Sequence, residues 1–191
     1  MQEPFAENPD PRALRSRKAL RNALIELLQE QPLEQISVRD IVARAGVGYA
    51  TFFRHYPSKE AALSDIANEQ ITELFRLSVP VMEEGAHSAA ITLLSYVDQH
   101  RSLWVPLLTG GAASAVREQF LRQARQVEAV QGDPGAWLPS RLGVRLLVSS
   151  TLELITWWLS EPEPFTVEHV AEILERTVVT PIISASTGVS G

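Results

Sequence analysis

The chain has 191 residues, of which 45% are apolar and 21% charged, a composition that excludes an intrinsically disordered protein. It contains no cysteine, so a disulfide framework and a thiolate metal site are also excluded. No segment reaches the roughly 20 apolar residues of a membrane span. Because the acidic, polar N-terminus is unlike a signal peptide, we expect a cytoplasmic protein with no membrane partner.

The net charge of −6 hides a strong asymmetry along the sequence. Residues 11–59 hold nine Arg or Lys against four acids, a balance of +5, whereas residues 60–191 hold eight bases against 16 acids, a balance of −8. Binding to phosphate depends on the local charge, so a low overall pI does not exclude a nucleic-acid partner. The asymmetry predicts a basic DNA-binding head on an acidic body.

The first predicted helix runs from Pro11 to about Gln29, after a polar arm over residues 1–9 that we expect to be disordered. Asp10 suits the N-cap position and Pro11 the first helical position, while Pro32 stops the helix. The arginines of its first turns are either DNA contacts or part of a solvated face, and both possibilities stay open. The apolar residues of one face are Leu14, Ala19, Leu20, Ala23, Leu24, Leu27 and Leu28.

Residues 37–46 predict the first helix of a helix-turn-helix. Ser37 is a good N-cap, and Asp40 three residues later completes a capping box. Gly46 supplies the left-handed residue that commonly ends a helix. Arg39 and Arg44 lie off the apolar face, where they stay available to solvent or to phosphate.

A short second helix is predicted from Tyr49 to about His55, with Gly48 as its N-cap. Pro57 ends it and pushes the preceding residue toward extended geometry. Within this segment Phe52 and Tyr56 are expected to pack in the core. In helix-turn-helix proteins the second helix enters the major groove of DNA, with its N-terminal residues against the bases.

The run AGVGYATFFRHYPSKEAAL resembles the recognition-helix signature of the TetR family of transcriptional repressors, and the resemblance covers about 50 residues. It is specific, because a bare helix-turn-helix does not require Pro57, Lys59 and Glu60 after the aromatic pair. Two positions depart from the family pattern: Gly48 stands where Ser or Thr is common, and Phe53 stands where Tyr is commonest.

The resemblance implies an all-α fold in two parts. Residues 1–57 would form a three-helix helix-turn-helix DNA-binding head, and residues 58–191 a helical ligand-binding and dimerisation body. The partners it implies are double-stranded DNA, a second copy of the chain and an unknown small-molecule effector. It implies no cofactor. We expect a repressor that binds a pseudo-palindromic operator as a homodimer and is released by a small apolar ligand.

Nine residues are candidates for DNA contacts. The methyl groups of Ala50 and Thr51 suit a thymine methyl, and Tyr49 suits a base edge or the backbone, although surface residues without a DNA role remain the alternative. By resemblance His55 and Lys59 match positions that touch phosphates, and the helix N-terminus at Ser37 could bind another phosphate. The full set is Ser37, Arg39, Gly48, Tyr49, Ala50, Thr51, Phe53, His55 and Lys59.

The rest of the chain predicts helices throughout, without an alternating strand pattern. The first begins after Ser58 and runs to about Val79, where Pro80 interrupts it. Further helices are expected at about 87–100, 103–108, 112–130 and 139–159, and from after Thr166 to about Thr180. Glycines at 110 and 111 and a turn at 132–135 separate them, and residues 184–191 form a small, polar tail.

Aromatic residues of this second part predict a cavity for a small molecule. Plain core packing is the alternative for each of them taken singly. Trp157 and Trp158 diverge by about 100° on a helix, so they cannot both face one cavity. The pocket candidates are Met82, Tyr96, Trp104, Phe120, Trp137 and Trp157.

A surplus of apolar residues on the last two long helices predicts a homodimer. The 139–159 helix is apolar on more than one face, which a partner subunit would cover, in keeping with the four-helix bundle that the resemblance implies. A deep monomeric core is the alternative. The interface candidates are Leu142, Leu146, Leu152, Ile155, Trp158, Val170, Ile173 and Leu174.

The sequence offers little for catalysis or metal binding. His87, His100 and His169 lack the spacing of metal ligands, and no nucleophile-elbow or phosphate-loop motif is present. We therefore expect a DNA-binding regulator that is not an enzyme. Two alternatives stay open: a helical small-molecule-binding protein or enzyme with a vestigial helix-turn-helix, and a protein-interaction module that binds an acidic partner through its head.

Overall fold

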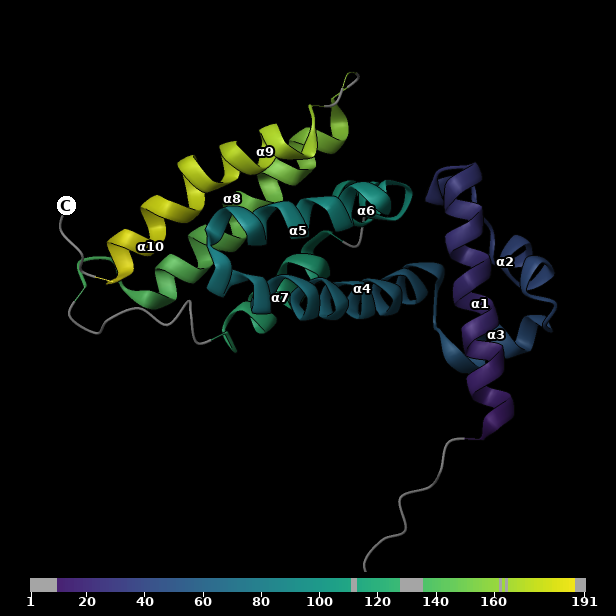
Figure 1. Ribbon diagram of the computed structural model, residues 1–191. Coiled ribbons are helices and arrows are strands. Elements are labelled where there is room, and N and C mark those ends of the chain that lie inside the picture. The colour runs from purple at the N-terminus through teal and green to yellow at the C-terminus, as the bar shows by residue number, and fades with distance from the viewer. Residues whose placement is uncertain (1–9, 111–112, 128–135, 162, 164, 188–191) are drawn as a thin grey trace, which may run out of the picture. The chain divides into compact units, whose positions relative to one another are not determined.

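The computed structural model describes residues 10–110, 113–127, 136–161, 163 and 165–187, and every regular element within these ranges is helical (Figure 1). The predicted all-α class is therefore confirmed. Contacts divide the chain into unit 1, residues 1–63, and unit 2, residues 64–191. The predicted arm at 1–9, the turn at 132–135 and the last four residues of the tail lie outside the described residues.

Unit 1 contains α1 (Pro11–Glu30), a 3-10 turn (Leu33–Gln35), α2 (Val38–Ala45), α3 (Tyr49–His55) and the start of α4 (Lys59–Val81). The predicted limits of these helices are confirmed to within a residue or two. Asp10 caps α1 by accepting a hydrogen bond of 2.9 Å from the Arg12 amide. The core of the unit is fully buried, and its innermost side chains are Leu20, Leu24, Ile36, Ile41, Phe52 and Leu63.

Two residues of the predicted apolar face of α1 are not buried, since Ala19 is half-buried and Leu14 is exposed. Leu14 is 50% exposed, and the buried stripe of this helix begins only at Leu20. The stripe continues to Leu28, and α2 and α3 pack against α1. Since these two helices have eight and seven residues against 20 in α1, they cannot cover its whole length.

The start and end of α2 follow the predicted local signals. The Ser37 hydroxyl accepts a hydrogen bond from the Asp40 amide, and the Asp40 carboxylate accepts one of 2.8 Å from the Ser37 amide. The Ser37 hydroxyl also donates to this carboxylate, and the hydrogen bonds from the hydroxyl and then from the amide of Ser37 lower the pKa of Asp40. At the other end Gly46 has a φ of 65°, which is the left-handed conformation predicted for it. The capping box and the glycine together fix the length of α2.

Replacement of Gly46 by alanine is expected to destabilise unit 1 by about 1 kcal/mol, because a left-handed backbone costs that much for a residue with a Cβ atom. An added Cβ atom would meet no other atom within 4 Å, so the cost is conformational and not steric. Chemical denaturation of the full chain measures it. Gly48 has a φ of −74°, so Gly48→Ala is the matched control and should cost clearly less.

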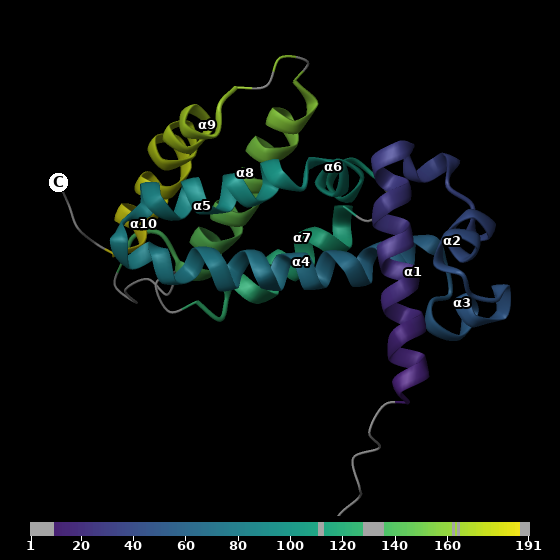
Figure 2. The ribbon, with the colours of Figure 1, turned by 45° about the vertical axis from the view of Figure 1, so that its right-hand side comes forward.

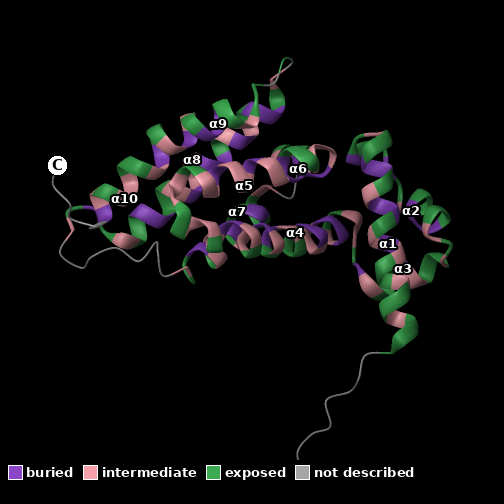
Figure 3. Ribbon diagram, in the orientation of Figure 1, coloured by how far each residue is buried: buried purple, intermediate pink, exposed green. Residues whose placement is uncertain are grey.

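Unit 2 contains most of α4, a 3-10 turn (Met82–Glu84), α5 (Ala86–Gln99), α6 (Arg101–Thr109), α7 (Ala113–Ala124), α8 (Ser140–Ser160), α9 (Val167–Leu174), a π-helical segment (Glu175–Val179) and α10 (Thr180–Thr187). Helix α8 contacts α6, α7, α9 and α10, and α9 packs on α5 (Figure 2). The buried residues lie on the sides of these helices that face one another (Figure 3).

Three helix ends in unit 2 differ from the prediction. Helix α7, expected to reach residue 130, ends at Ala124. The other two ends involve proline. Helix α4 runs through Pro80 to Val81, although Pro80 lacks the N–H that would bond the Arg76 carbonyl, and the helix gives way to the 3-10 turn directly afterwards. The final helix does not end near Thr180. It continues through the π-helical segment into α10, and Pro181, the second residue of α10, follows this wider turn directly.

Among the described helices, α8 is long and apolar enough to cross a membrane by length and composition. The buried core helix of a soluble protein meets the same test. Since 44% of the most apolar window of α8 is buried and the helix packs on four others, it fits the core of unit 2.

Candidate nucleic-acid interface and ligand cavity

Helix α3 presents an exposed aromatic pair. Tyr49 is 52% exposed and Phe53 47%, and their ring centroids lie 5.2 Å apart, one helical turn from each other. Ala50 is exposed beside them, whereas Phe52 is fully buried. We call Tyr49, Ala50 and Phe53 the outer face of α3. Adjacent large apolar side chains at a surface commonly mark a binding site.

An open cleft of about 730 Å³ joins α3 to the start of α1. It brings two arginines together with hydroxyl and imidazole groups, which are side chains that contact DNA phosphates. Sequence reasoning did not single out Ser16 or Arg54, because their approach depends on tertiary packing and leaves no local signal. The residues that line the cleft are Asp10, Arg12, Ala13, Ser16, Val47, Gly48, Thr51, Arg54 and His55.

His55 is partly buried and tied to α1. One of its ring nitrogens, Nε2, lies 2.8 Å from the Ser16 hydroxyl. Burial, and then the positive charges of Arg54 and Arg17, lower the pKa of His55. The free protein therefore favours a neutral imidazole at this position, so the predicted phosphate contact at His55 would not start from a charged ring.

The stability of unit 1 is expected to fall as the pH is lowered from about 8 to about 5.5, through the range in which His55 takes up a proton. The unfolded chain binds that proton at a higher pH than the folded chain does, because the folded pKa is lowered. Unfolding midpoints of the full chain and of His55→Gln at both pH values measure the effect. The variant should lose less stability over this range, and equal losses would contradict the assignment.

Lys59 holds the 3-10 turn of unit 1. Its ammonium group donates hydrogen bonds of 2.7 Å to the Leu33 carbonyl and 2.8 Å to the Ile36 carbonyl, with the Glu34 carbonyl 3.5 Å away. These acceptors match the three donors of an ammonium group. The predicted phosphate contact at Lys59 is corrected accordingly, because its donors are directed at the backbone of its own unit.

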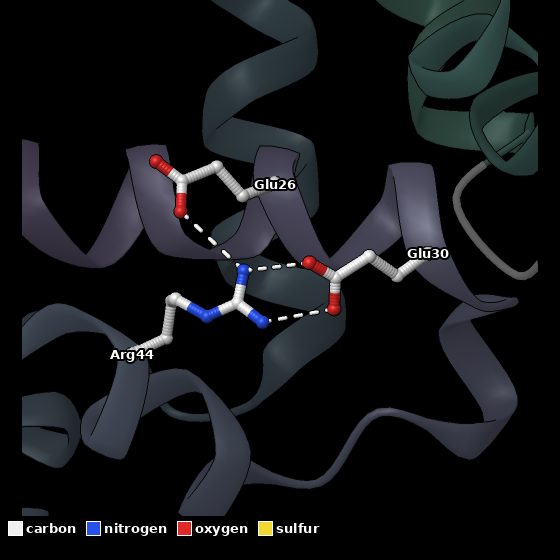
Figure 4. Close-up of polar contacts among 3 residues, drawn as sticks. All are labelled: Glu26, Glu30 and Arg44. Carbon is white, nitrogen blue, oxygen red and sulfur yellow. Dashed lines mark hydrogen bonds and ion pairs between the residues drawn. The ribbon is translucent and has the colours of Figure 1, made fainter.

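Arg44 is likewise engaged within unit 1 (Figure 4). Its guanidinium donates two hydrogen bonds, of 2.9 and 2.8 Å, to the Glu30 carboxylate and lies 3.5 Å from the Glu26 carboxylate. The hydrogen bond from Arg44 lowers the pKa of Glu30. Arg44 is exposed to solvent as expected, but its guanidinium is already paired with two acids of α1. Arg39 is exposed on α2.

Among the remaining candidates for DNA contacts, Ser37 and Thr51 form hydrogen bonds with nearby side chains, and Gly48 has no side chain to form one. The Ser37 hydroxyl is used in the capping box and also donates to the Asp40 carboxylate at 2.6 Å. The Thr51 hydroxyl accepts a hydrogen bond of 3.3 Å from Arg54. Gly48 caps α3 without a side-chain hydrogen bond, and a Cβ atom there would meet Thr51 at an ordinary 3.8 Å.

Unit 2 contains a partly enclosed apolar cavity of about 130 Å³. Two of the six predicted pocket residues, Met82 and Phe120, line it. Trp104 lies outside the lining and is 1% exposed, with its ring 5.9 Å from that of Phe120. The cavity is therefore bounded mainly by aliphatic side chains.

The three other pocket candidates also lie outside the cavity lining. The Tyr96 hydroxyl donates a hydrogen bond of 2.7 Å to Gln70, and burial raises its pKa. Trp137 is 79% exposed, and Trp157 stacks on Phe165 at 5.4 Å. The prediction from aromatic residues is corrected for Tyr96, Trp104, Trp137 and Trp157.

The dimer candidates divide into two groups. Five of them have at most 3% of their surface exposed, and so belong to the core of unit 2 itself: Leu152, Ile155, Trp158, Val170 and Leu174. For these residues the predicted interface role is corrected. Leu142 is 46% exposed, Leu146 41% exposed, and Ile173 partly exposed, so the prediction of an interface is retained for these three.

Within the part of the chain that the structure describes, no three His, Asp or Glu side chains are grouped to hold a metal ion. His87 instead lies 2.8 Å from the Glu175 carboxylate, and the His100 ring bonds the Tyr96 carbonyl at 2.8 Å. These contacts are accounted for by packing between and within helices.

A helix-turn-helix with an exposed second helix, followed by a larger all-helical unit, defines the class of DNA-binding transcriptional regulators. Residues 20–66 match the family model for bacterial regulatory proteins of the tetR family. This match assigns the helix-turn-helix part of the chain to the tetR family, and the fold of the chain is that of solved TetR-family regulators. No curated protein matches it significantly.

Solved structures of TetR-family proteins share the whole fold at low sequence identity. A regulator from Streptococcus agalactiae 2603V is 24% identical with a TM-score of 0.66, over 88% of this chain and 96% of that one. NalD of Pseudomonas aeruginosa, the secondary repressor of the MexAB-OprM multidrug efflux pump, is 21% identical with a TM-score of 0.63, over 94% and 100%. The repressor FadR of Thermus thermophilus, solved with lauroyl-CoA, is 18% identical with a TM-score of 0.63, over 85% and 93%.

Proposed function

We propose that the protein is a repressor that binds a pseudo-palindromic DNA site as a homodimer and leaves it when a small apolar molecule binds in unit 2. The observation that carries the DNA part is the outer face of α3. Tyr49 and Phe53 remain about half exposed although the same short helix buries Phe52 completely. In a helix-turn-helix, the exposed face of the second helix fits the major groove of DNA.

In this proposal residues 1–57 are the DNA-binding head and residues 58–191 the ligand-binding and dimerisation body. The exposed leucines of α8, Leu142 and Leu146, supply apolar surface for a partner subunit. A two-fold axis would place two copies of α3 about one DNA turn apart, roughly 34 Å, or a small multiple of it. The target is then two half-sites in opposite orientation.

The cavity of unit 2 supports release by a ligand. Helix α4 takes part in both functions. Lys59 at its start binds the 3-10 turn of unit 1, and Leu74, Phe75, Ser78 and Val79 contribute to the cavity wall. A ligand that binds more tightly to a conformation unsuited to DNA lowers the affinity for DNA, and the size of this effect is the coupling free energy between the two sites. A hundredfold release needs about 2.7 kcal/mol. NalD and FadR, which are called repressors, support this direction of regulation.

Selection from a pool of randomised DNA duplexes tests the proposal. The purified protein is expected to enrich one pseudo-palindromic sequence at about physiological salt. A single half-site without symmetry would contradict the dimer, and failure to enrich any sequence would favour a vestigial head or a protein-binding module. A loss of affinity for the selected duplex when a cavity ligand is added would support release.

A further inference from the structure

The cavity of unit 2 owes its space to small side chains. Helix α5 contributes three alanines to its wall, Ala86, Ala89 and Ala90, and α7 contributes Ala124. Larger aliphatic and aromatic side chains from α4, α8 and α10 close the other sides. The volume of about 130 Å³ is close to that of the cavities, roughly 150 Å³, that hold one benzene molecule.

The wall carries no charge. Among the described residues that line the cavity, none is acidic or basic, and Ser78 of α4 and Thr151 of α8 are the two that carry a hydroxyl group. An ion entering this space would lose its hydration without gaining a counter-charge, which is strongly unfavourable. Cations and anions are therefore excluded as occupants, whereas neutral molecules are not.

Ser78 is the unusual residue of this wall. It is 7% exposed, and its buried hydroxyl oxygen has no hydrogen-bond partner. Other hydroxyls on helices of unit 2 donate to the carbonyl four residues earlier, as those of Thr72, Thr92 and Thr156 do at 2.7–3.0 Å. Buried polar groups are nearly always bonded, so an unbonded hydroxyl on a residue that lines a cavity indicates a missing partner.

We propose that the cavity binds a neutral molecule about the size of one six-membered ring, and that Ser78 hydrogen-bonds the single hydroxyl or carbonyl group of that ligand. This inference rests on the proposed ligand-binding function and gives the chemical class of the ligand. The apolar wall supplies most of the affinity, because apolar surface leaves water. Ser78 supplies orientation and selects a ligand with one polar group over a pure hydrocarbon.

Calorimetric titration of the purified full chain with phenol and toluene, in the absence of DNA, tests the proposal. Ser78→Ala is expected to weaken phenol binding about fivefold, the effect of losing one hydrogen bond, and to leave toluene affinity within about twofold. Ser64→Ala is the matched control, because Ser64 also lies on α4 but outside the cavity lining. It should change neither affinity.

Two further measurements locate the site and its charge preference. Ala90→Leu fills the cavity from α5 and should weaken both ligands at least tenfold, with its unfolding midpoint checked to show that it is folded. Benzoate and benzylammonium should bind the parent protein at least tenfold more weakly than phenol. Undiminished phenol binding in Ser78→Ala, binding of a charged probe as tight as that of phenol, or no binding of phenol would overturn the inference.

The outcomes also separate this inference from the proposed function. If phenol binds through Ser78 but does not change the affinity for the selected DNA duplex, the cavity assignment stands and ligand release by this class fails. If the protein selects a pseudo-palindrome but phenol does not bind, the DNA-binding function stands and the ligand class is wrong.

Discussion

Replacing Lys59 by methionine is expected to lower the free energy of unfolding of unit 1 by about 2–3 kcal/mol. The ammonium group donates to the Leu33 and Ile36 carbonyls, and both hydrogen bonds are partly buried. Methionine keeps the apolar stem but leaves the two carbonyls without this donor. Amide hydrogen exchange in α2 and α3 of the full chain measures the loss, because it reports the opening of individual segments.

Lys18→Met is the matched control for this experiment. Lys18 is exposed on α1, so the same change of side chain there should alter the stability of unit 1 by less than about 0.5 kcal/mol. If Lys59→Met kept full stability and instead weakened DNA binding with a shallower dependence on salt, Lys59 would act on phosphate as the sequence predicted. The two readouts thus distinguish a backbone-binding lysine from a phosphate-binding one.

Tyr49→Ala is expected to reduce affinity for the selected DNA site by about 10- to 100-fold and to relax specificity at the bases nearest the ring, since a specific base contact contributes that much. The ring is 52% exposed, so its removal costs the fold little. Binding to the selected duplex and to a scrambled one, with unfolding midpoints of both proteins, makes the measurement.

Tyr49→Phe separates the hydroxyl of this residue from its ring. The ring lies 5.2 Å from that of Phe53, and phenylalanine preserves that contact. A loss with Tyr49→Phe as large as with Tyr49→Ala would assign the contact to the hydroxyl, and a small loss would assign it to the ring. Equal weakening on the selected and scrambled duplexes would contradict a role in base recognition.

The sequence predicted unit 1 well because its helix limits depend on local chemistry. Ser37 and Asp40 lie three residues apart and bond each other, and Gly46 adopts the left-handed conformation that its position requires. Such signals need no knowledge of the rest of the fold. Proline was the weaker guide, since α4 passes through Pro80 in its last turn.

The roles of charged and polar side chains were harder to predict, because they depend on neighbours distant in sequence. Lys59 reaches carbonyls 23 and 26 residues earlier, and His55 bonds a hydroxyl 39 residues away. Exposure to phosphate was the expectation for both. In the folded protein α1 and the 3-10 turn supply other partners for these side chains. The residue spacing within a single helix does not predict them.

The cavity was mispredicted for a related reason. Aromatic residues mark a large apolar core, but a cavity forms where side chains are small, as along Ala86, Ala89 and Ala90 of α5. Whether a small residue leaves a void depends on what the opposite helix places against it. The same limit applies to the interface candidates of α8, where burial and exposure alternate within a single turn.

All four tryptophans belong to unit 2, and Tyr49 and Tyr56 belong to unit 1. Indole emission therefore gives an optical signal from unit 2 alone, whereas tyrosine emission comes from both units because Tyr96 lies in unit 2. Trp104 packs against Phe120, which borders the cavity. A molecule entering there alters the surroundings of that indole, so the protein carries a built-in fluorophore for screening compounds without a label.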